Sequence, residues 1–193
     1  MPRAFGAVRS RVDTFDKRVD SAFDALRGRH PVDRLFYAAS ELGDYSLLWI
    51  LLGGLRGLRS ERDWNAALRL GAGLAAESFL VNAVIKSLFR RSRPPSEVER
   101  PLRVRRPKTS SFPSGHATSA LVAAILLSEG DPVWPLYYGL AAIVATSRIY
   151  TKMHHASDVA AGMAVGVALG LAGRRLVPLP PVADDAQGAA ARS

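Results

Sequence analysis

Three short motifs hold the side chains of this 193-residue sequence that are best suited to chemistry. Hydrolysis of a phosphate ester needs cations on the non-bridging oxygens, a nucleophile, and a proton for the leaving oxygen. Arginine offers a planar fork to phosphate oxygens, whereas lysine acts as a point charge. The motifs are Lys86 with Arg93 and Pro94; Pro-Ser-Gly-His at 113–116; and Ser147-Arg148 with His154 and Asp158. Together they predict a site for an anionic phosphate.

The third motif offers a nucleophile. His154 stands four residues before Asp158, and a carboxylate bonded to one ring nitrogen leaves the other nitrogen as a nucleophile or base. Asp158 and Ser157 could equally cap a helix. His155 is a second candidate, because nothing in the residues themselves excludes it.

The second motif directly precedes an apolar segment. Backbone N–H groups at the start of a helix, beside a small glycine such as Gly115, form a natural seat for an anion. The hydroxyl of Ser114 could add a further donor, although a serine at this position is often only an N-cap. Taken singly, Lys86, Arg93 and Arg148 could be ordinary cations at helix ends.

The elements around these motifs are predicted to be helices. Residues 10–27 carry apolar side chains at three- and four-residue steps, which predicts an amphipathic helix in a membrane interface or packed on the domain. Gly162, Gly166 and Gly170 form a small-residue stripe of the kind that lets helices approach closely in lipid. The remaining apolar runs cover 35–58, 64–89, 116–128, 133–147 and 157–177.

These runs predict an all-α integral membrane bundle of about five transmembrane helices. The expected organisation is an amphipathic segment at 1–32, a membrane domain at 33–177 and a disordered tail at 178–193. A simple span needs about 20 apolar residues, and several runs are shorter, so a soluble helical bundle is the alternative. Glu77 lies inside an apolar run, which predicts that it faces the interior of the bundle.

Alternating directions would bring the three motifs together. If consecutive helices cross in opposite directions, the loops at 90–115 and 148–157 share one side, and the turn at 129–132 lies on the other. We therefore expect all three motifs to meet at one end of the bundle.

Composition narrows the partners. The formal net charge of +9 suits a phosphorylated substrate or an anionic membrane surface. No basic run is interleaved with aromatic residues, which argues against nucleic acid. Cysteine is absent, which excludes thiol catalysis and zinc–thiolate sites. The first thirty residues show no continuous apolar core, so no cleavable signal peptide is expected.

The three motifs, in this order and spacing, resemble those of the type 2 phosphatidic acid phosphatase (lipid phosphate phosphatase) superfamily. The resemblance covers about residues 35–175. It implies that His154 attacks phosphorus to form a phosphohistidine, that Asp158 orients it, and that His116 protonates the leaving oxygen and later activates water. It also favours His154 over His155 and implies no metal. The groups that would hold the phosphoryl oxygens are Lys86, Arg93, Ser114, the Gly115 amide and Arg148.

The chain also departs from this family. Many members have a further apolar helix at the N-terminus, where this chain has the amphipathic segment; five spans would then place the N-terminus on the active-site side. Lys152 and Ala156 stand where glycine and proline are common. The compact form resembles small bacterial members assigned to decaprenylphosphoryl phosphoribose.

We therefore expect a multi-pass cell-membrane phosphatase that hydrolyses a lipid phosphate monoester or diphosphate without a cofactor, with its active site on the extracytoplasmic side. Phosphatidic acid, phosphatidylglycerol phosphate, an isoprenyl diphosphate and a polyprenyl-linked sugar phosphate all fit as substrates. Two alternatives are a vanadate-dependent haloperoxidase and a non-catalytic protein that binds phosphorylated lipid.

Overall fold

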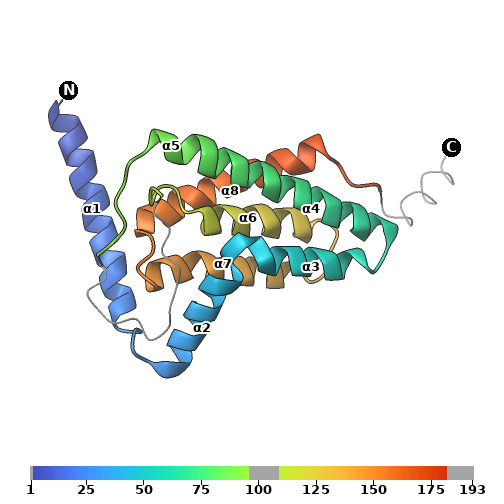
Figure 1. Cartoon of the computed structure of the whole chain (residues 1–193), viewed down its shortest axis with the longest axis horizontal. Helices are drawn as coiled ribbons and strands as arrows, with labels where there is room; N and C mark the ends of the chain where they lie inside the picture. The colour runs from blue at the N-terminus through green and yellow to red at the C-terminus, as the bar shows by residue number, and fades with distance from the viewer. Residues whose placement is uncertain (1, 96–108, 182–193) are drawn as a thin grey trace.

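The computed structural model describes residues 2–95 and 109–181, and all regular elements within these ranges are helical, as predicted (Figure 1). In chain order they are α1 (Pro2–Asp24), α2 (His30–Leu42), the 3-10 turn η1 (Asp44–Ser46), α3 (Leu47–Gly57), α4 (Glu61–Phe79), the π-helical stretch η2 (Leu80–Ile85), α5 (Lys86–Leu88), α6 (Gly115–Ser128), α7 (Trp134–Tyr150) and α8 (Ala156–Leu176).

Helix α6 is the centre of the bundle. Its sequence is apolar around the whole circumference, which is typical of a helix enclosed by others. The side chains from 117 to 127 are all buried, and the helix contacts α3, α4, α7 and α8. The first turn of α6 carries Gly115 and His116, so the best-packed helix of the protein also positions the second motif.

The glycine stripe of α8 is the surface that packs against α6. A Cβ atom on Gly162 would lie 2.5 Å from the carbonyl oxygen of Ser114, and one on Gly166 would lie 2.5 Å from that of Thr118. Both distances are too short for any real contact, so the two backbones approach closely only because these residues are glycine. The predicted role of the stripe is confirmed, and it sets the position of α8 relative to the loop before α6.

The predicted helix at 35–58 is wrong as a single element. The chain breaks between α2 and α3, where Tyr45 and Ser46 have φ values of 54° and 58° that a right-handed helix cannot contain. The two helices run in different directions (Figure 1). The corner packs against the site: a Cβ atom on Gly43 would lie 2.7 Å from the His116 ring.

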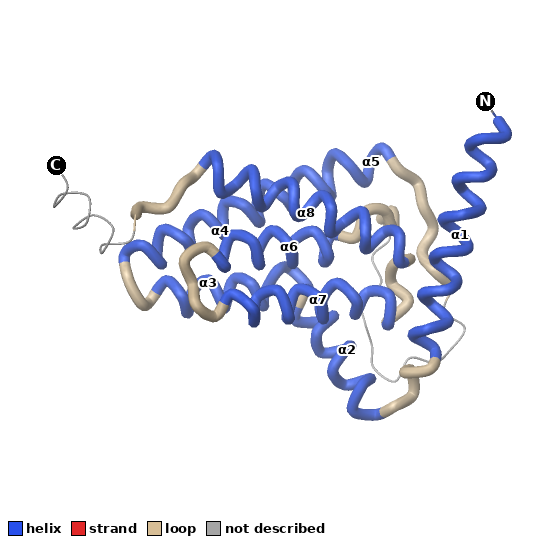
Figure 2. Tube along the Cα trace, turned by 180° about the vertical axis from the view of Figure 1, so that it is seen from behind, coloured by secondary structure: helices blue, strands red, loops and turns tan. Residues whose placement is uncertain are grey.

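The bundle has two distinct ends. Helix α1 lies across one end and contacts α7 and α8 (Figures 1 and 2). The α2–α3 corner, the loop before α6 and the α7–α8 loop all contribute to the cavity at this end. At the other end, Asp131 of the α6–α7 turn pairs with Arg59 of the α3–α4 turn. The expected separation of the loops is therefore confirmed.

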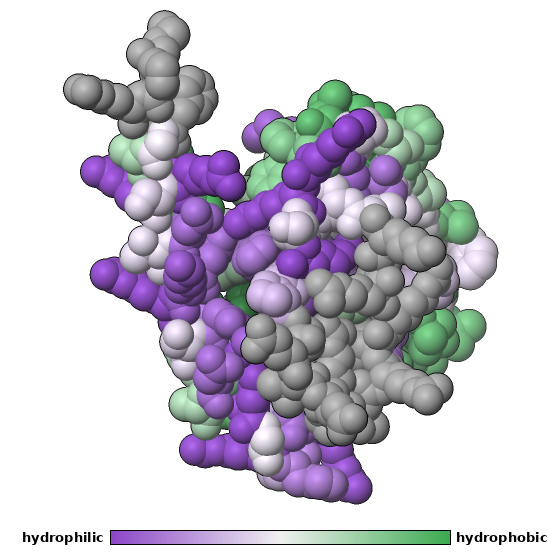
Figure 3. Space-filling model, turned by 60° about the vertical axis from the view of Figure 1, so that its left-hand side comes forward, coloured by the Kyte–Doolittle hydropathy of each residue, from purple (hydrophilic) through white to green (hydrophobic). Residues whose placement is uncertain are grey.

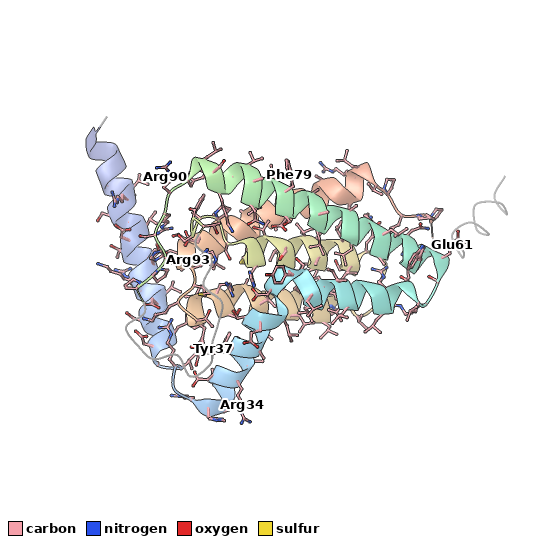
Figure 4. The ribbon with its side chains drawn as sticks, in the orientation of Figure 1. Arg34, Tyr37, Glu61, Phe79, Arg90 and Arg93 are labelled. Carbon is pink, nitrogen blue, oxygen red and sulfur yellow. The ribbon has the colours of Figure 1, made fainter. Side chains whose placement is uncertain are left out.

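Two helical stretches among the described residues are long and apolar enough to cross a membrane. They are Glu61–Leu88, which joins α4, η2 and α5, and Ala156–Leu176; the apolar helix α6 is shorter. Large apolar side chains also remain exposed on the outside of the bundle. Phe79, which is 70% exposed, points away from the other helices (Figure 4). Such an apolar flank suits a lipid environment.

Candidate active site

A cavity of about 410 Å³ opens at the end of the bundle nearest α1. Figure 4 shows Arg93 at this end and Glu61 at the opposite one. Hydrophilic side chains gather over α1, whereas hydrophobic side chains gather at the upper and right-hand edges of the bundle in this view (Figure 3). Six of the predicted site residues line the cavity: Lys86, Arg93, Gly115, His116, Arg148 and His154.

The tautomer of His154 follows from its neighbours. Nδ1 lies 2.6 Å from the carbonyl oxygen of Ser111, which can only accept, so Nδ1 carries the hydrogen. Nε2 lies 3.1 Å from Nη1 of Arg93, which can only donate, so Nε2 holds the lone pair. The ring is 3% exposed. His154 therefore turns a nucleophilic nitrogen to a cation that lines the cavity.

The environment also keeps His154 neutral. Burial, together with the nearby charges of Arg148 and Arg93, lowers the pKa of His154 from 6.5 to about 3, although Asp158 acts in the opposite direction. A neutral imidazole has the free lone pair that nucleophilic attack requires.

Asp158 lies beside His154 but does not form a direct hydrogen bond with it. Its Oδ2 atom is 3.8 Å from Nδ1 of His154, and it accepts instead from the backbone N–H of His155 at 2.9 Å. This is the helix-capping arrangement that the sequence left open. The nearer acceptor for Nδ1 is the Ser111 carbonyl, which no sequence pattern could single out because every residue has a carbonyl.

Arg91 is a residue that sequence reasoning missed. One guanidinium nitrogen donates to Asp158 at 2.6 Å and to Ser157 at 2.8 Å, and another donates to Asp16 of α1 at 2.6 Å. Asp16 also accepts from the backbone N–H and hydroxyl of Ser157, both at 2.8 Å. The amphipathic helix is thereby tied to the start of α8, directly behind His154.

His116 is held by the α2–α3 corner. Its Nε2 atom lies 2.9 Å from a carboxylate oxygen of Asp44 and 3.2 Å from the carbonyl oxygen of Ser40. Both neighbours accept hydrogen bonds, so Nε2 carries a hydrogen. Asp44 was visible in the sequence only as an interruption of an apolar run, and its contact with His116 could not be foreseen.

Three cations reach the cavity from three different segments. Lys86 follows the π-helical stretch η2, and its ammonium donates to Asn82 at 2.9 Å. Arg93 donates to the Met153 carbonyl at 2.8 Å. Arg148, which is fully buried, donates to the hydroxyl of Ser40. A single small anion between them would contact all three segments at once, which suits phosphate oxygens.

Glycine at 115 keeps this space open. A Cβ atom here would lie 3.7 Å from the Lys86 ammonium, so a side chain would occupy the volume beside that cation. Ser114 is fully buried and is absent from the cavity lining. Its side chain accepts from the Ala117 N–H at 3.5 Å as the N-cap of α6, and its own N–H donates to the Asp158 carbonyl at 3.0 Å.

The two adjacent histidines differ in position. His154 lines both the main cavity and a neighbouring cavity of about 300 Å³ beside α1, whereas His155 lines the neighbouring cavity and not the main one. Lys152, in the same loop, has φ of 51°, a conformation that glycine adopts more easily. Its ammonium donates to Asp20 of α1 at 3.1 Å, a contact that glycine could not make.

The described residues were also compared with the usual ligand sets of metal ions. Within 2–95 and 109–181, no group of three or more His, Asp or Glu side chains is placed to hold a metal ion. Residues 96–108, which belong to the loop at 90–115 and include Arg103, Arg105 and Arg106, lie outside the described residues.

Comparisons with known proteins identify the family of this chain. Residues 66–179 match the PAP2 superfamily. The decaprenylphosphoryl-5-phosphoribose phosphatase of Mycobacterium tuberculosis is 37% identical over 68% of this chain and 72% of its own length. The enzyme of the same name from Mycolicibacterium smegmatis is 36% identical over 72% of this chain and 75% of its own length.

Solved structures show the same fold. A transmembrane PAP2-type phosphatidylglycerolphosphate phosphatase from Bacillus subtilis superposes with a TM-score of 0.67 at 23% identity, covering 86% of each chain. LpxE from Aquifex aeolicus superposes with a TM-score of 0.64 at 25% identity, covering 82% of this chain and 93% of its own. The chain therefore belongs to the PAP2 superfamily, as an enzyme that hydrolyses lipid phosphates.

Proposed function

We propose that this enzyme removes the terminal phosphate from a polyprenyl-linked sugar phosphate, through a phosphohistidine on His154. The observation that carries the mechanism is the bare Nε2 of a neutral His154, 3.1 Å from Arg93, at a cavity that Lys86 and Arg148 also line. The substrate class rests on the two mycobacterial relatives, which are named as phosphatases of decaprenylphosphoryl-5-phosphoribose.

The reaction proceeds in two displacements. Nε2 of His154 attacks phosphorus, and the bond from phosphorus to the leaving oxygen breaks. His116 acts in this step as the imidazolium: its Nε2–H stays on Asp44, and it gives the Nδ1 proton to the leaving oxygen. Lys86, Arg93 and Arg148, with the Gly115 amide, stabilise the charge on the phosphoryl oxygens. Ser114, which is buried outside the cavity lining, contributes by capping α6 rather than by the direct contact expected from the sequence. Water then attacks the phosphohistidine, His116 accepts its proton, and inorganic phosphate leaves. Asp158 supports His154 through the start of α8.

The bundle formed by α3, α4–α5, α6, α7 and α8 would span the membrane as about five helices, with α1 in the interface. The apolar flank and the two long apolar stretches support this placement. Helix α6, with 14 residues, is roughly 21 Å long, but its neighbours shield it from lipid.

The active-site end would face the extracytoplasmic side. Support for this placement comes from the family resemblance. Lysines and arginines are present at both ends of the bundle: the far end has Arg56, Arg59, Arg62 and Arg174, and α1 at the site end has Arg9, Arg11, Lys17 and Arg18. Because the chain has no cysteine, single-cysteine variants at Lys17 and Arg62 would report orientation with a membrane-impermeant maleimide in intact cells. Labelling only at position 17 is expected; labelling only at position 62 would reverse the orientation.

Phosphate release from purified protein tests the function. A panel of decaprenylphosphoryl-5-phosphoribose, phosphatidylglycerol phosphate, phosphatidic acid and an isoprenyl diphosphate would be compared between the wild type and His154→Ala. We expect the pentose lipid to give the highest kcat/KM, and the variant to release no phosphate. Unchanged release by the variant would contradict the mechanism, and preference for another lipid would contradict the substrate class.

A further inference from the structure

Glu77 is a buried carboxylate that the proposed mechanism does not use. It lies on α4, is 3% exposed, and lines the same cavity as His116 and His154. Its Oε1 atom has no hydrogen-bond partner among the described residues. Leaving such a group unsatisfied is costly. Oε1 itself is shielded, but the side chain borders the cavity, so a small rotation of the carboxyl group would let a ligand there supply the missing donor.

The next cation after Glu77 along the chain, Lys86, binds another side chain. Lys86 donates to Asn82 at 2.9 Å, and Asn82 donates to Ser78 at 3.2 Å. No lysine or arginine nitrogen in the described part of the chain lies within 4.0 Å of the Glu77 carboxylate. Glu77 is therefore not a direct ion-pair partner of the phosphate-binding lysine.

Glu77 lies farther into the bundle than the cations that would hold the phosphate. Ser78, Asn82 and Lys86 follow one another at four-residue steps on one face of the helix, and all three line the cavity. One helical turn advances about 5.4 Å along the axis, so Glu77 and Ser78 lie toward the interior of the bundle from the phosphate cations. Ser46 and Ser119 line the same cavity. This wall therefore borders the part of the cavity next to the phosphate cations, where the leaving group of a substrate can lie.

The side chains of this wall, Glu77, Ser78 and Asn82, favour hydroxyl groups over a second anion beside the phosphate. A carboxylate repels a second phosphate but accepts hydrogen bonds from one or two hydroxyls, and the neighbouring serine and asparagine side chains can both donate and accept. We infer that Glu77, with Ser78 and Asn82, forms a subsite for the neutral, hydroxyl-bearing part of the leaving group. This inference rests on the proposed function. It makes Glu77 a specificity-determining residue for substrates with a sugar next to the phosphate.

The test compares substrates with and without hydroxyls at this position. Decaprenylphosphoryl-5-phosphoribose has free pentose hydroxyls, and phosphatidylglycerol phosphate has one free glycerol hydroxyl. In phosphatidic acid both other glycerol oxygens are esterified. Each would be assayed with wild type, Glu77→Gln and a matched control, Glu61→Gln, which changes an exposed residue at the far end of the same helix.

We expect Glu77→Gln to lower kcat/KM for the pentose substrate at least about tenfold, mainly through KM, because a hydrogen bond to a charged group is lost. The value for phosphatidic acid should stay within about twofold, which also shows that the variant is folded. A loss for phosphatidylglycerol phosphate as well would extend the subsite to glycerol. Glu61→Gln should behave as wild type with every lipid.

Two results would overturn the inference. Equal losses on all three lipids would make Glu77 an electrostatic neighbour of Lys86, and no loss on any lipid would remove it from the substrate site. The proposed function fails separately, if His154→Ala still releases phosphate while the Glu77 comparison keeps its pattern.

Discussion

The two ends of the bundle use the same residue types for opposite purposes. At the far end, arginines meet carboxylates across helices: Arg56 lies 2.6 Å from Asp63, Arg59 2.5 Å from Asp131, and Arg69 2.8 Å from Glu129. These ion pairs connect the α3–α4 and α6–α7 turns and the helices beside them. At the end beside α1, cations from three segments instead line a cavity of about 410 Å³.

The difference shows where charge serves stability and where it serves binding. An ion pair between two helices contributes little net energy but costs several kcal/mol, on the order of 3–5, when one buried partner is removed. A cation that lines a cavity has its main effect on the anion that enters. Variants at the two ends should therefore separate activity from stability.

The largest expected effect is at Arg148. Arg148→Met should lower kcat at least about 100-fold, because one donor to the phosphoryl oxygens is lost. The matched variant at the far end, Arg59→Met, should keep kcat within about twofold while lowering the unfolding temperature. Phosphate release and thermal unfolding of both variants would be measured in the same detergent. Similar activity losses in the two variants would erase the functional distinction between the ends.

A smaller effect on activity is expected from the contact between α1 and the site. Asp16→Asn weakens the ion pair with Arg91, which in turn holds Asp158. We expect about a tenfold loss in kcat with little change in KM, as for residues that orient a catalytic group through another residue. Asp13→Asn, an exposed change one turn earlier on α1, is the control. A rise in KM alone would indicate that α1 binds substrate instead.

At the far end, Asp131 should matter for stability alone. Burial raises the pKa of Asp131, but hydrogen bonds from Arg59, the Val133 amide and Tyr137 outweigh burial and lower the pKa below 3.8. The stabilisation is therefore complete above pH 3.8 and is lost as the pH falls below it. Asp131→Asn should cost roughly 1–3 kcal/mol in the free energy of unfolding at pH 7, with activity retained. Loss of activity without loss of stability would contradict this assignment.

The smallest effect concerns acid stability at the site end. Because the pKa of His154 is lowered from 6.5 to about 3, only the unfolded chain binds the proton between these values. Stability from this residue is therefore present above pH 6.5 and declines as the pH falls toward 3. His154→Gln should lose less stability than the wild type between pH 7 and pH 4. If the free energy of unfolding fell equally with pH in the two proteins, His154 would not be held neutral in the folded state.

Features with a local signature were predictable from the sequence. Each of these features depends only on neighbours along one helix: they are the apolar runs of α4, α6, α7 and α8 and the spacing of Gly162 and Gly166. The alternation of helix directions was then enough to predict that Lys86 and His154 lie at the same end of the bundle. The break between α2 and α3 was not predicted, because Tyr45 and Ser46 adopt positive φ values that their residue types do not announce.

Contacts between segments that are distant in the chain could not be predicted from the sequence. Asp16 and Arg91 are 75 positions apart, and neither stands in a pattern that marks the other. The Asp44–His116 contact depends on the angle of the α2–α3 corner, and the hydrogen bond from His154 to Ser111 uses a backbone carbonyl. The motifs thus identified side chains that the structure gathers around one cavity, whereas the groups that hold those side chains in place depend on tertiary structure.

Trapping the covalent intermediate tests the central claim most directly. Enzyme mixed with a lipid phosphate would be quenched in alkali, where a phosphohistidine survives, and digested for mass spectrometry. We predict a phosphoryl group on His154, absent from His154→Ala and unaffected by His155→Ala. A phosphoryl group on any other residue, or phosphate release by His154→Ala at the wild-type rate, would contradict the account.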